Sequence, residues 1–266
     1  PDVWDVINEP DLSTPLYSGT QIGQAIKAAG DKLVANGFTA KFNGPSNTST
    51  GQARFHIDAM ASVPGALQYI DTFTYHRYTG ADVEMLGELR NRAVLHSKKL
   101  AMTEWYLPQN SYVTLHEDLK FGINSSWEEF ALAWLGPDTG GILVEVTGAT
   151  SVTISQRAKF YRQYFKYVRR GAVRYEATSN SGNLDALAFR NVDKHTVVVK
   201  ANNGGTINVS GLPSGTYGIF YTTNSAYNVN LPNQTINSGQ ILTTSIPTTG
   251  VLTVYATNGG SPTPTP

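Results

Sequence analysis

The sequence predicts an α/β domain followed by an all-β domain, because the hydrophobic pattern changes along the chain. Up to about residue 155, short apolar runs alternate with segments of helical periodicity, which is typical of a parallel sheet covered by helices. After Gly171 the apolar runs are short and alternating, and turn-forming clusters separate them, as in an antiparallel β-sandwich. The chain ends in a Pro/Thr repeat, which predicts an extended linker. We therefore expect domains at residues 1–170 and 171–258 and a linker at 259–266.

Short apolar runs predict the strands of the first domain, which are expected at residues 3–7, 41–43, 70–75, 100–104 and 141–146. Between them, apolar residues three or four positions apart indicate crossover helices. These residues are Ile22, Ile26, Ala29 and Leu33, then Phe55, Ile57 and Met60, then Val83, Leu86, Leu89 and Ala93.

Two further helices are expected before the second domain. Ser125 lies three residues before Glu128, at the head of the apolar run 130–134, and this spacing predicts a capping box and a fourth helix. Residues 156–170 carry aromatic side chains on one face and end at Gly171, so they predict a helix that packs against the following domain. In that domain, strands are expected at the alternating runs 186–189, 196–199, 218–221 and 251–255.

Composition excludes several classes of protein. The 266 residues contain 20 basic and 20 acidic side chains, so the charge gives no reason to expect a nucleic acid or a membrane as partner. There is no cysteine, which excludes disulfides and thiol chemistry, and no apolar stretch approaches the length of a membrane span. The low charged fraction of 15% leaves a polar, uncharged surface that suits carbohydrate and is common in secreted proteins. Without an initiator Met, the chain is expected to be processed or truncated.

Two glutamates end similar apolar runs and carry the functional prediction. Glu9 lies in Asn8-Glu9-Pro10 after the run 3–7, and Glu104 ends the run 100–104. In a parallel barrel, residues at the carboxyl ends of different strands meet over one mouth. Cleavage of a glycosidic bond requires such a pair of carboxyl groups, one as proton donor and one as nucleophile or stabiliser. The sequence therefore predicts a glycosidase.

Three segments resemble the retaining glycoside hydrolases of clan A: Trp4-Asp5-Val6-Ile7-Asn8-Glu9-Pro10, Thr74-Tyr75-His76-Arg77-Tyr78 and Met102-Thr103-Glu104-Trp105. A helix that ends within the segment Tyr167-Val168-Arg169-Arg170-Gly171-Ala172-Val173-Arg174 and leads into a sandwich is similar to the xylanase and glucosylceramidase families of that clan. The resemblance implies strands four to eight of a (β/α)8 TIM barrel, followed by a β-sandwich. It also implies a secreted enzyme that cleaves β-linked plant polysaccharide with retention, with cellulose preferred as substrate and xylan next.

The resemblance also implies roles for individual residues. Glu9 corresponds to the acid/base and Glu104 to the nucleophile, while Asn8 is expected to bond the sugar 2-hydroxyl. His76 or Tyr78 is expected to hold Glu104 ionised and oriented; which of the two does so is left open.

Three other residues are weaker candidates for substrate binding. Trp105 and Trp134 each offer a stacking face, with the alternatives that Trp105 packs behind the barrel and that Trp134 belongs to the core. Glu145 is either a third active-site carboxylate or a paired surface charge. The remaining histidines are scattered without metal-ligand spacing, so no metal and no cofactor are predicted.

A barrel that begins at its fourth strand leaves open edges at residues 3–7 and 142–146, which predicts homo-oligomers or an upstream segment. The linker suggests a tethered carbohydrate-binding module. Two alternative functions stay open: a catalytically impaired half barrel that only binds carbohydrate, and a transglycosidase.

Overall fold

The computed structural model describes residues 3–109 and 111–257, and the predicted linker at 259–266 lies outside them. The chain divides into two compact units, Pro1–Leu143 and Val144–Pro266. This division falls before the boundary expected at residue 170.

The first unit contains a five-stranded parallel sheet in the order β1-β2-β3-β4-β5. The strands are β1 (Trp4–Asp5), β2 (Phe42–Ser49), β3 (Ile70–Thr79), β4 (Lys99–Glu104) and β5 (Ser126–Trp127). The predicted strands at 41–43, 70–75 and 100–104 therefore lie in the sheet, whereas only two residues of the predicted run 3–7 form a strand. All five strands run in the same direction, so Glu104, at the carboxyl end of β4, and Glu9, which follows β1, lie at the same end of the sheet.

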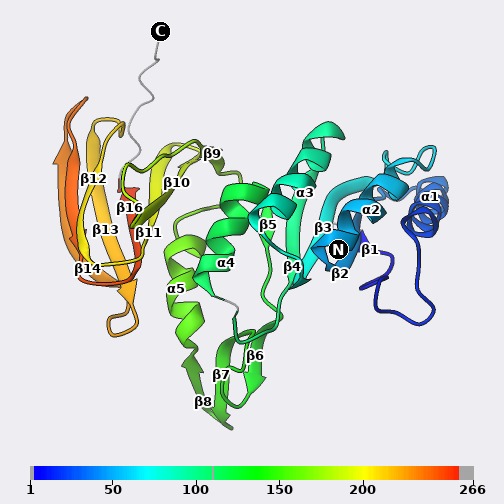
Figure 1. Cartoon of the computed structure of the whole chain (residues 1–266), viewed down its shortest axis with the longest axis horizontal. Coiled ribbons are helices and arrows are strands. Elements are labelled where there is room, and N and C mark those ends of the chain that lie inside the picture. The colour runs from blue at the N-terminus through cyan, green and yellow to red at the C-terminus, as the bar shows by residue number, and fades with distance from the viewer. Residues whose placement is uncertain (1–2, 110, 258–266) are drawn as a thin grey trace. The chain divides into compact units, whose positions relative to one another are not determined.

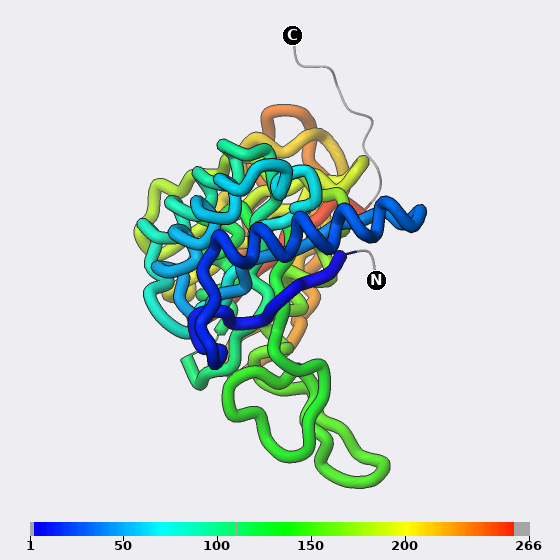
Figure 2. Tube along the Cα trace, turned by 90° about the vertical axis from the view of Figure 1, so that its right-hand side faces the viewer, coloured from blue at the N-terminus to red at the C-terminus, as the bar shows by residue number. Residues whose placement is uncertain are grey.

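Helices α1 (Gly19–Ala35), α2 (Thr50–Ala61) and α3 (Val83–Leu95) connect the strands, as the periodicity predicts (Figure 1). Ser18 and Gln21 form a reciprocal capping box at the start of α1, and Ile22 and Ile26 are buried on its inner face. Beside β1, α1 lines an apolar cavity of about 550 Å³, and Figure 2 shows the N-terminal segment running alongside this helix. The outer edge of β1 is thus bordered by an apolar surface.

The prediction of a helix at residues 125–134 is wrong, because the segment forms strands. The backbone N–H groups of Ser125 and Glu128 instead donate to Leu100 and Met102 of the neighbouring strand, at 2.8 and 2.9 Å, so this segment forms β5. Residues Ala131–Leu135 form strand β6. Strand pairing, of residues 125–128 with β4 and of Ala131 with Gly141, therefore overrides the local helical pattern and removes the capping role of Ser125.

A short α-helix and a π-helix, which the sequence analysis missed, precede β5. They are α4 (Tyr112–Glu117) and η1 (Asp118–Gly122). Asp118 is fully buried in η1, where its carboxylate accepts a 2.8 Å hydrogen bond from Trp127 Nε1 on β5. This contact fixes the outward face of β5.

The strand predicted at 141–146 exists as β7 (Ile142–Gly148), but it is not a strand of the parallel sheet. It pairs antiparallel with β8 (Ser151–Ile154), with Glu145 opposite Thr153. The position beside β4 that was expected for it is taken by β5. The number of parallel strands was predicted correctly, but the identity of the fifth was wrong.

The second unit is built on a six-stranded antiparallel sheet in the order β14-β13-β16-β11-β10-β9, with a separate pair β12-β15. The strands are β9 (Val173–Tyr175), β10 (Leu184–Asn191), β11 (Lys194–Ala201), β12 (Gly205–Val209), β13 (Gly215–Thr223), β14 (Val229–Ile236), β15 (Leu242–Ile246) and β16 (Gly250–Ala256). Buried side chains of both sheets form one core, which confirms the predicted antiparallel β architecture.

Helix α5 (Gln156–Phe165) covers this sheet and is shorter than predicted. Gln163 is fully buried: its side-chain Nε2 donates to Thr222 at 2.8 Å, and its backbone carbonyl accepts from the Thr253 hydroxyl at 2.9 Å. The prediction that this helix packs against the following strands is confirmed. Among the residues described, no helix is both long and apolar enough to cross a membrane.

Candidate active site

Glu9 begins a tight turn in the loop that follows β1. Its backbone N–H donates to Ser46 on β2, and its carbonyl accepts from Leu12 and Ser13. Glu9 has a φ of 52°, a left-handed conformation that costs a residue with a side chain of this size roughly 1–3 kcal/mol. The turn aims the carboxylate at β3, where Oε1 lies 3.0 Å from Nδ1 of the buried His76.

Glu104 ends β4 and receives a hydrogen bond from the next strand. The Tyr78 hydroxyl donates to its Oε1 at 2.7 Å. Burial, the hydrogen bond to Glu104 and the charges of Glu104, Glu9 and Glu129 raise the pKa of Tyr78 far above its ordinary value. Tyr78 therefore stays protonated at neutral pH and acts as a donor. Of the two alternatives that the sequence left open, Tyr78 contacts Glu104 and His76 contacts Glu9.

Alternation along β3 separates two sets of side chains. His76 and Tyr78 point to the face that carries the glutamates, whereas Tyr75 and Arg77 point to the opposite face. The register between β3 and β4 shifts after Tyr75, so that His76 lies directly beside Glu104. This irregularity brings the two glutamates and their partners to one place.

Glu9, His76 and Glu104 each offer a side-chain atom within 4.8 Å of the other two. Oxygen and nitrogen atoms at this spacing also suit a divalent cation. Hydrogen bonding already accounts for the arrangement, since His76 is bonded to Glu9 and Tyr78 to Glu104. For two carboxyl groups, a separation near 5 Å is the geometry of a retaining glycosidase, in which one carboxylate attacks the sugar carbon directly.

The other predicted residues are distributed as follows. Asn8 is exposed next to Glu9. Trp105 is buried, with its ring 5.0 Å from the Arg77 guanidinium, so it packs on the face away from Glu104. Trp134 lies on β6 and is 59% exposed, so it is not the core residue that a helix would have made it. Glu145 lies on β7, outside the parallel sheet, and the reason for expecting it at the strand ends no longer holds.

Sequence reasoning missed Glu129, whose charge reaches Tyr78. Glu129 follows β5, so it lies beyond the carboxyl end of a parallel strand, like Glu9 and Glu104. The residue was overlooked because its segment was interpreted as a helix.

No protein-family model matches the chain, and no curated protein matches it in sequence. Solved structures do match. A GH30 endoxylanase from Clostridium papyrosolvens C71 aligns with a TM-score of 0.78 and 17% identity, covering 96% of this chain and 65% of that one. The catalytic domain of GH30 xylanase C from Talaromyces cellulolyticus aligns with a TM-score of 0.77 and 19% identity, covering 97% and 62%. A GH44 xyloglucanase from Paenibacillus polymyxa aligns with a TM-score of 0.63 and 12% identity, covering 96% and 66%.

These similarities confirm the predicted likeness to the fold of clan A glycoside hydrolases. The chain spans less than two thirds of the length of each of these structures.

Proposed function

We propose that the chain is a retaining glycoside hydrolase that acts on β-linked polysaccharide. The observation that carries the proposal is the pair Glu9 and Glu104, whose nearest oxygen atoms lie within 4.8 Å and whose carboxylates each have a separate protein partner. Two carboxyl groups in this geometry leave no room for a water molecule between an inverting base and the sugar.

The reaction is a double displacement. Glu9 donates a proton to the leaving oxygen while Glu104 attacks the anomeric carbon and forms a glycosyl-enzyme. Water then attacks the anomeric carbon, and Glu9 accepts its proton as the bond to Glu104 breaks. The partners support the proposal: the Tyr78 hydroxyl donates to Glu104 and stabilises its ionised form, and Nδ1 of His76 lies 3.0 Å from Oε1 of Glu9 and orients that carboxyl group.

Three residues are proposed as substrate contacts. Asn8 is proposed to bond the sugar 2-hydroxyl, and Glu129 is added as a hydroxyl acceptor at the same edge. Trp134 offers an exposed stacking face on β6, whereas the burial of Trp105 removes it from that role.

We further propose that β1 to β5 correspond to strands four to eight of a (β/α)8 barrel, since they are parallel and follow chain order. Sequence reasoning prefers cellulose as substrate. The two GH30 proteins are xylanases and the GH44 protein is a xyloglucanase, so we propose xylan and β-glucan as equally good candidate substrates. Secretion and a tethered carbohydrate-binding module stay predictions.

A second candidate is a half barrel that binds carbohydrate without turnover. It is favoured by the coverage of only 62 to 65% of the two xylanase chains. Missing positioning residues can remove most of a rate even when the reacting groups remain.

Reducing-sugar release from xylan, carboxymethylcellulose and mixed-linkage β-glucan tests the proposal, with Glu104→Ala as the matched variant. Release that disappears in Glu104→Ala supports the hydrolase. Equal release by both proteins contradicts the role of Glu104, and polysaccharide binding without release supports the second candidate.

A further inference from the structure

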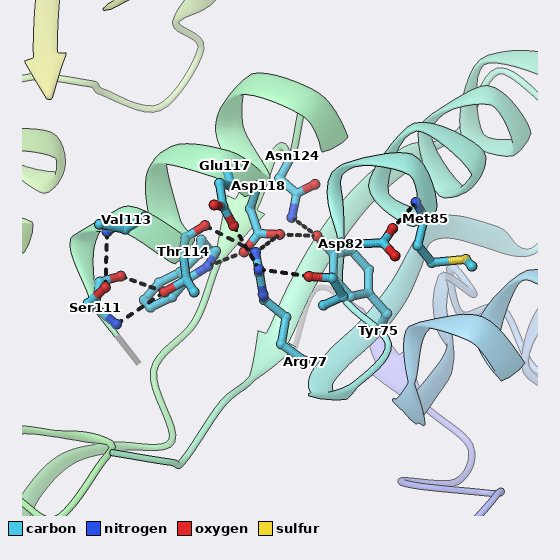
Figure 3. A network of polar contacts seen from close by, with 12 residues as sticks. Tyr75, Arg77, Asp82, Met85, Ser111, Val113, Thr114, Glu117, Asp118 and Asn124 are labelled. Carbon is cyan, nitrogen blue, oxygen red and sulfur yellow. Dashed lines mark hydrogen bonds and ion pairs between the residues drawn. The ribbon is translucent and has the colours of Figure 1, made fainter. Parts of the chain in front are cut away.

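A buried polar cluster lies on the face of β3 opposite the glutamates. Arg77 stands between His76 and Tyr78 in the sequence, and its side chain points away from theirs. Figure 3 shows the Arg77 side chain beside Thr114 and Glu117 of α4 and Asp118 of η1. The backbone that carries both glutamate partners is therefore held from behind by one side chain.

Arg77 is 4% exposed and meets two carboxylates. Its Nη1 lies 2.9 Å from Oδ1 of Asp118, and its Nη2 lies 3.0 Å from Oε2 of Glu117 (Figure 3). It also donates to the carbonyls of Thr114 and Ala81, both at 3.2 Å. A guanidinium with this many fixed acceptors has one orientation available, which is how arginine confers geometric specificity.

Asp118 connects three elements of the first unit. Tyr75 of β3 donates to its Oδ1 at 2.6 Å, and Trp127 of β5 donates to its Oδ2 at 2.8 Å. Burial raises the pKa of Asp118, and the charge of Arg77 together with these donors opposes that shift. Asp118 thus ties β3 and β5 to the π-helix.

Arg77 also contacts the strand that carries Glu104. Its guanidinium carbon lies 5.0 Å from the centre of the Trp105 ring, and Trp105 directly follows Glu104. Arg77 therefore contacts the residue after Glu104. Its two neighbours in the sequence, His76 and Tyr78, are the partners of Glu9 and Glu104.

We infer that Arg77 and Asp118 are positioning residues, which hold the carboxyl ends of β3 and β4 so that Tyr78 stays bonded to Glu104. This inference rests on the proposed function. A buried ion pair that served stability alone would be a poor choice, because apolar residues of similar volume commonly stabilise a core equally well. The pair lies directly behind the contact between Tyr78 and Glu104, and this location favours a role in positioning that contact.

A double-mutant cycle between Asp118→Asn and Tyr78→Phe tests the inference. Asp118→Asn keeps the shape of the side chain and weakens its hold on Arg77. We expect kcat on a soluble polysaccharide to fall about tenfold with KM nearly unchanged, because small displacements of reacting groups are costly. If Asp118 acts through Tyr78, the double variant loses little more than Tyr78→Phe alone; if the two effects multiply, the inference is overturned.

Controls separate positioning from folding. Each variant is assayed well below its unfolding midpoint. Arg92→Met removes a second arginine that bridges two carboxylates, Asp58 and Glu88 on α2 and α3, and we expect it to keep kcat. If Asp118→Asn does not fold, Glu117→Gln tests the same hold on Arg77 from a partly exposed position, with the same expected coupling to Tyr78→Phe.

The outcomes also distinguish this inference from the proposed function. An inactive wild-type chain contradicts both. Wild-type activity that Glu104→Ala abolishes, combined with independent effects of Asp118→Asn and Tyr78→Phe, contradicts the positioning role alone.

Discussion

Tyr78 reaches Glu104 across the junction of β3 and β4, and the 2.7 Å hydrogen bond between them depends on an irregular register. Tyr75 pairs with Met102, but the next pair is His76 with Glu104, so Thr103 is passed over. Without this extra residue, alternation would turn the Glu104 side chain to the opposite face. The site is therefore built on a local departure from regular strand pairing.

Replacing Tyr78 with Phe removes the hydroxyl and leaves the ring. We expect kcat/KM on the preferred polysaccharide to fall about 10- to 100-fold, because a donor to a charged reacting group is lost in a partly closed site. Steady-state kinetics measure the change. Tyr69→Phe is the matched control, since it removes a surface hydrogen bond to Asp31, and it should leave activity intact. Equal activity of Tyr78→Phe and wild type would contradict the role of Tyr78.

Variants of the two glutamates should differ in their response to the leaving group. Loss of the acid, in Glu9→Ala, matters most when the leaving oxygen is basic, so an aryl glycoside with an acidic phenol should be spared relative to polysaccharide. Loss of the nucleophile, in Glu104→Ala, should abolish the cleavage of both substrates. Initial rates on the two substrates measure this difference. The opposite pattern would exchange the roles of Glu9 and Glu104.

Much of the first unit could be predicted from periodicity. The strands at Phe42, Ile70 and Lys99 and the helices between them carry strong local patterns, and both glutamates follow from their places at strand ends. The fifth parallel strand could not be predicted in this way. It has two residues, and residues 130–134 just after it carry a misleading helical pattern, although most of them lie in β6, which pairs with β7.

The contact between the positioning residues Arg77 and Asp118 could not be predicted from the sequence either, for a different reason. Arg77 and Asp118 are 41 positions apart in the sequence (118 − 77 = 41). Asp118 lies in a π-helix, a structure that has no marked sequence signal. A lone Arg between His76 and Tyr78 gives no indication of which carboxylate it meets. The contact arises only when α4 and η1 fold back behind β3.

The apolar surface beside β1 leads to a prediction about association. Trp4 and Phe38 are 51% and 61% exposed, and both line the apolar cavity beside α1. Exposed apolar surface at a sheet edge favours pairing with another chain. We expect the mass of the purified chain, measured by light scattering, to rise with concentration, and Phe38→Asp to lower it. Val192→Asp, at a residue 83% exposed in the second unit, is the control. A constant monomer mass would contradict this prediction.

Asp11 fixes the turn that carries Glu9, and its effect should depend on pH. Its carboxylate accepts from the backbone N–H groups of Thr48 and Ser49, at 2.9 and 3.0 Å, and from the Thr48 hydroxyl at 2.9 Å. Burial alone would raise the pKa of Asp11, but these donors outweigh it and hold the pKa below its ordinary value.

A carboxyl group whose pKa is lowered by folding stabilises the fold above its unfolded pKa of about 3.9, and the contribution is lost as the pH falls through the folded value. Asp11→Ala should therefore lower the free energy of unfolding by about 1 kcal/mol at pH 7, a modest value because the carboxylate is partly solvated. Denaturant unfolding at pH 7 and near pH 3 measures both values, and the difference from wild type should shrink at the lower pH. Asp31→Ala, at an exposed ion pair with Lys27, should change neither value measurably. A loss of the same size at both pH values would show that Asp11 acts through packing and not through its charge.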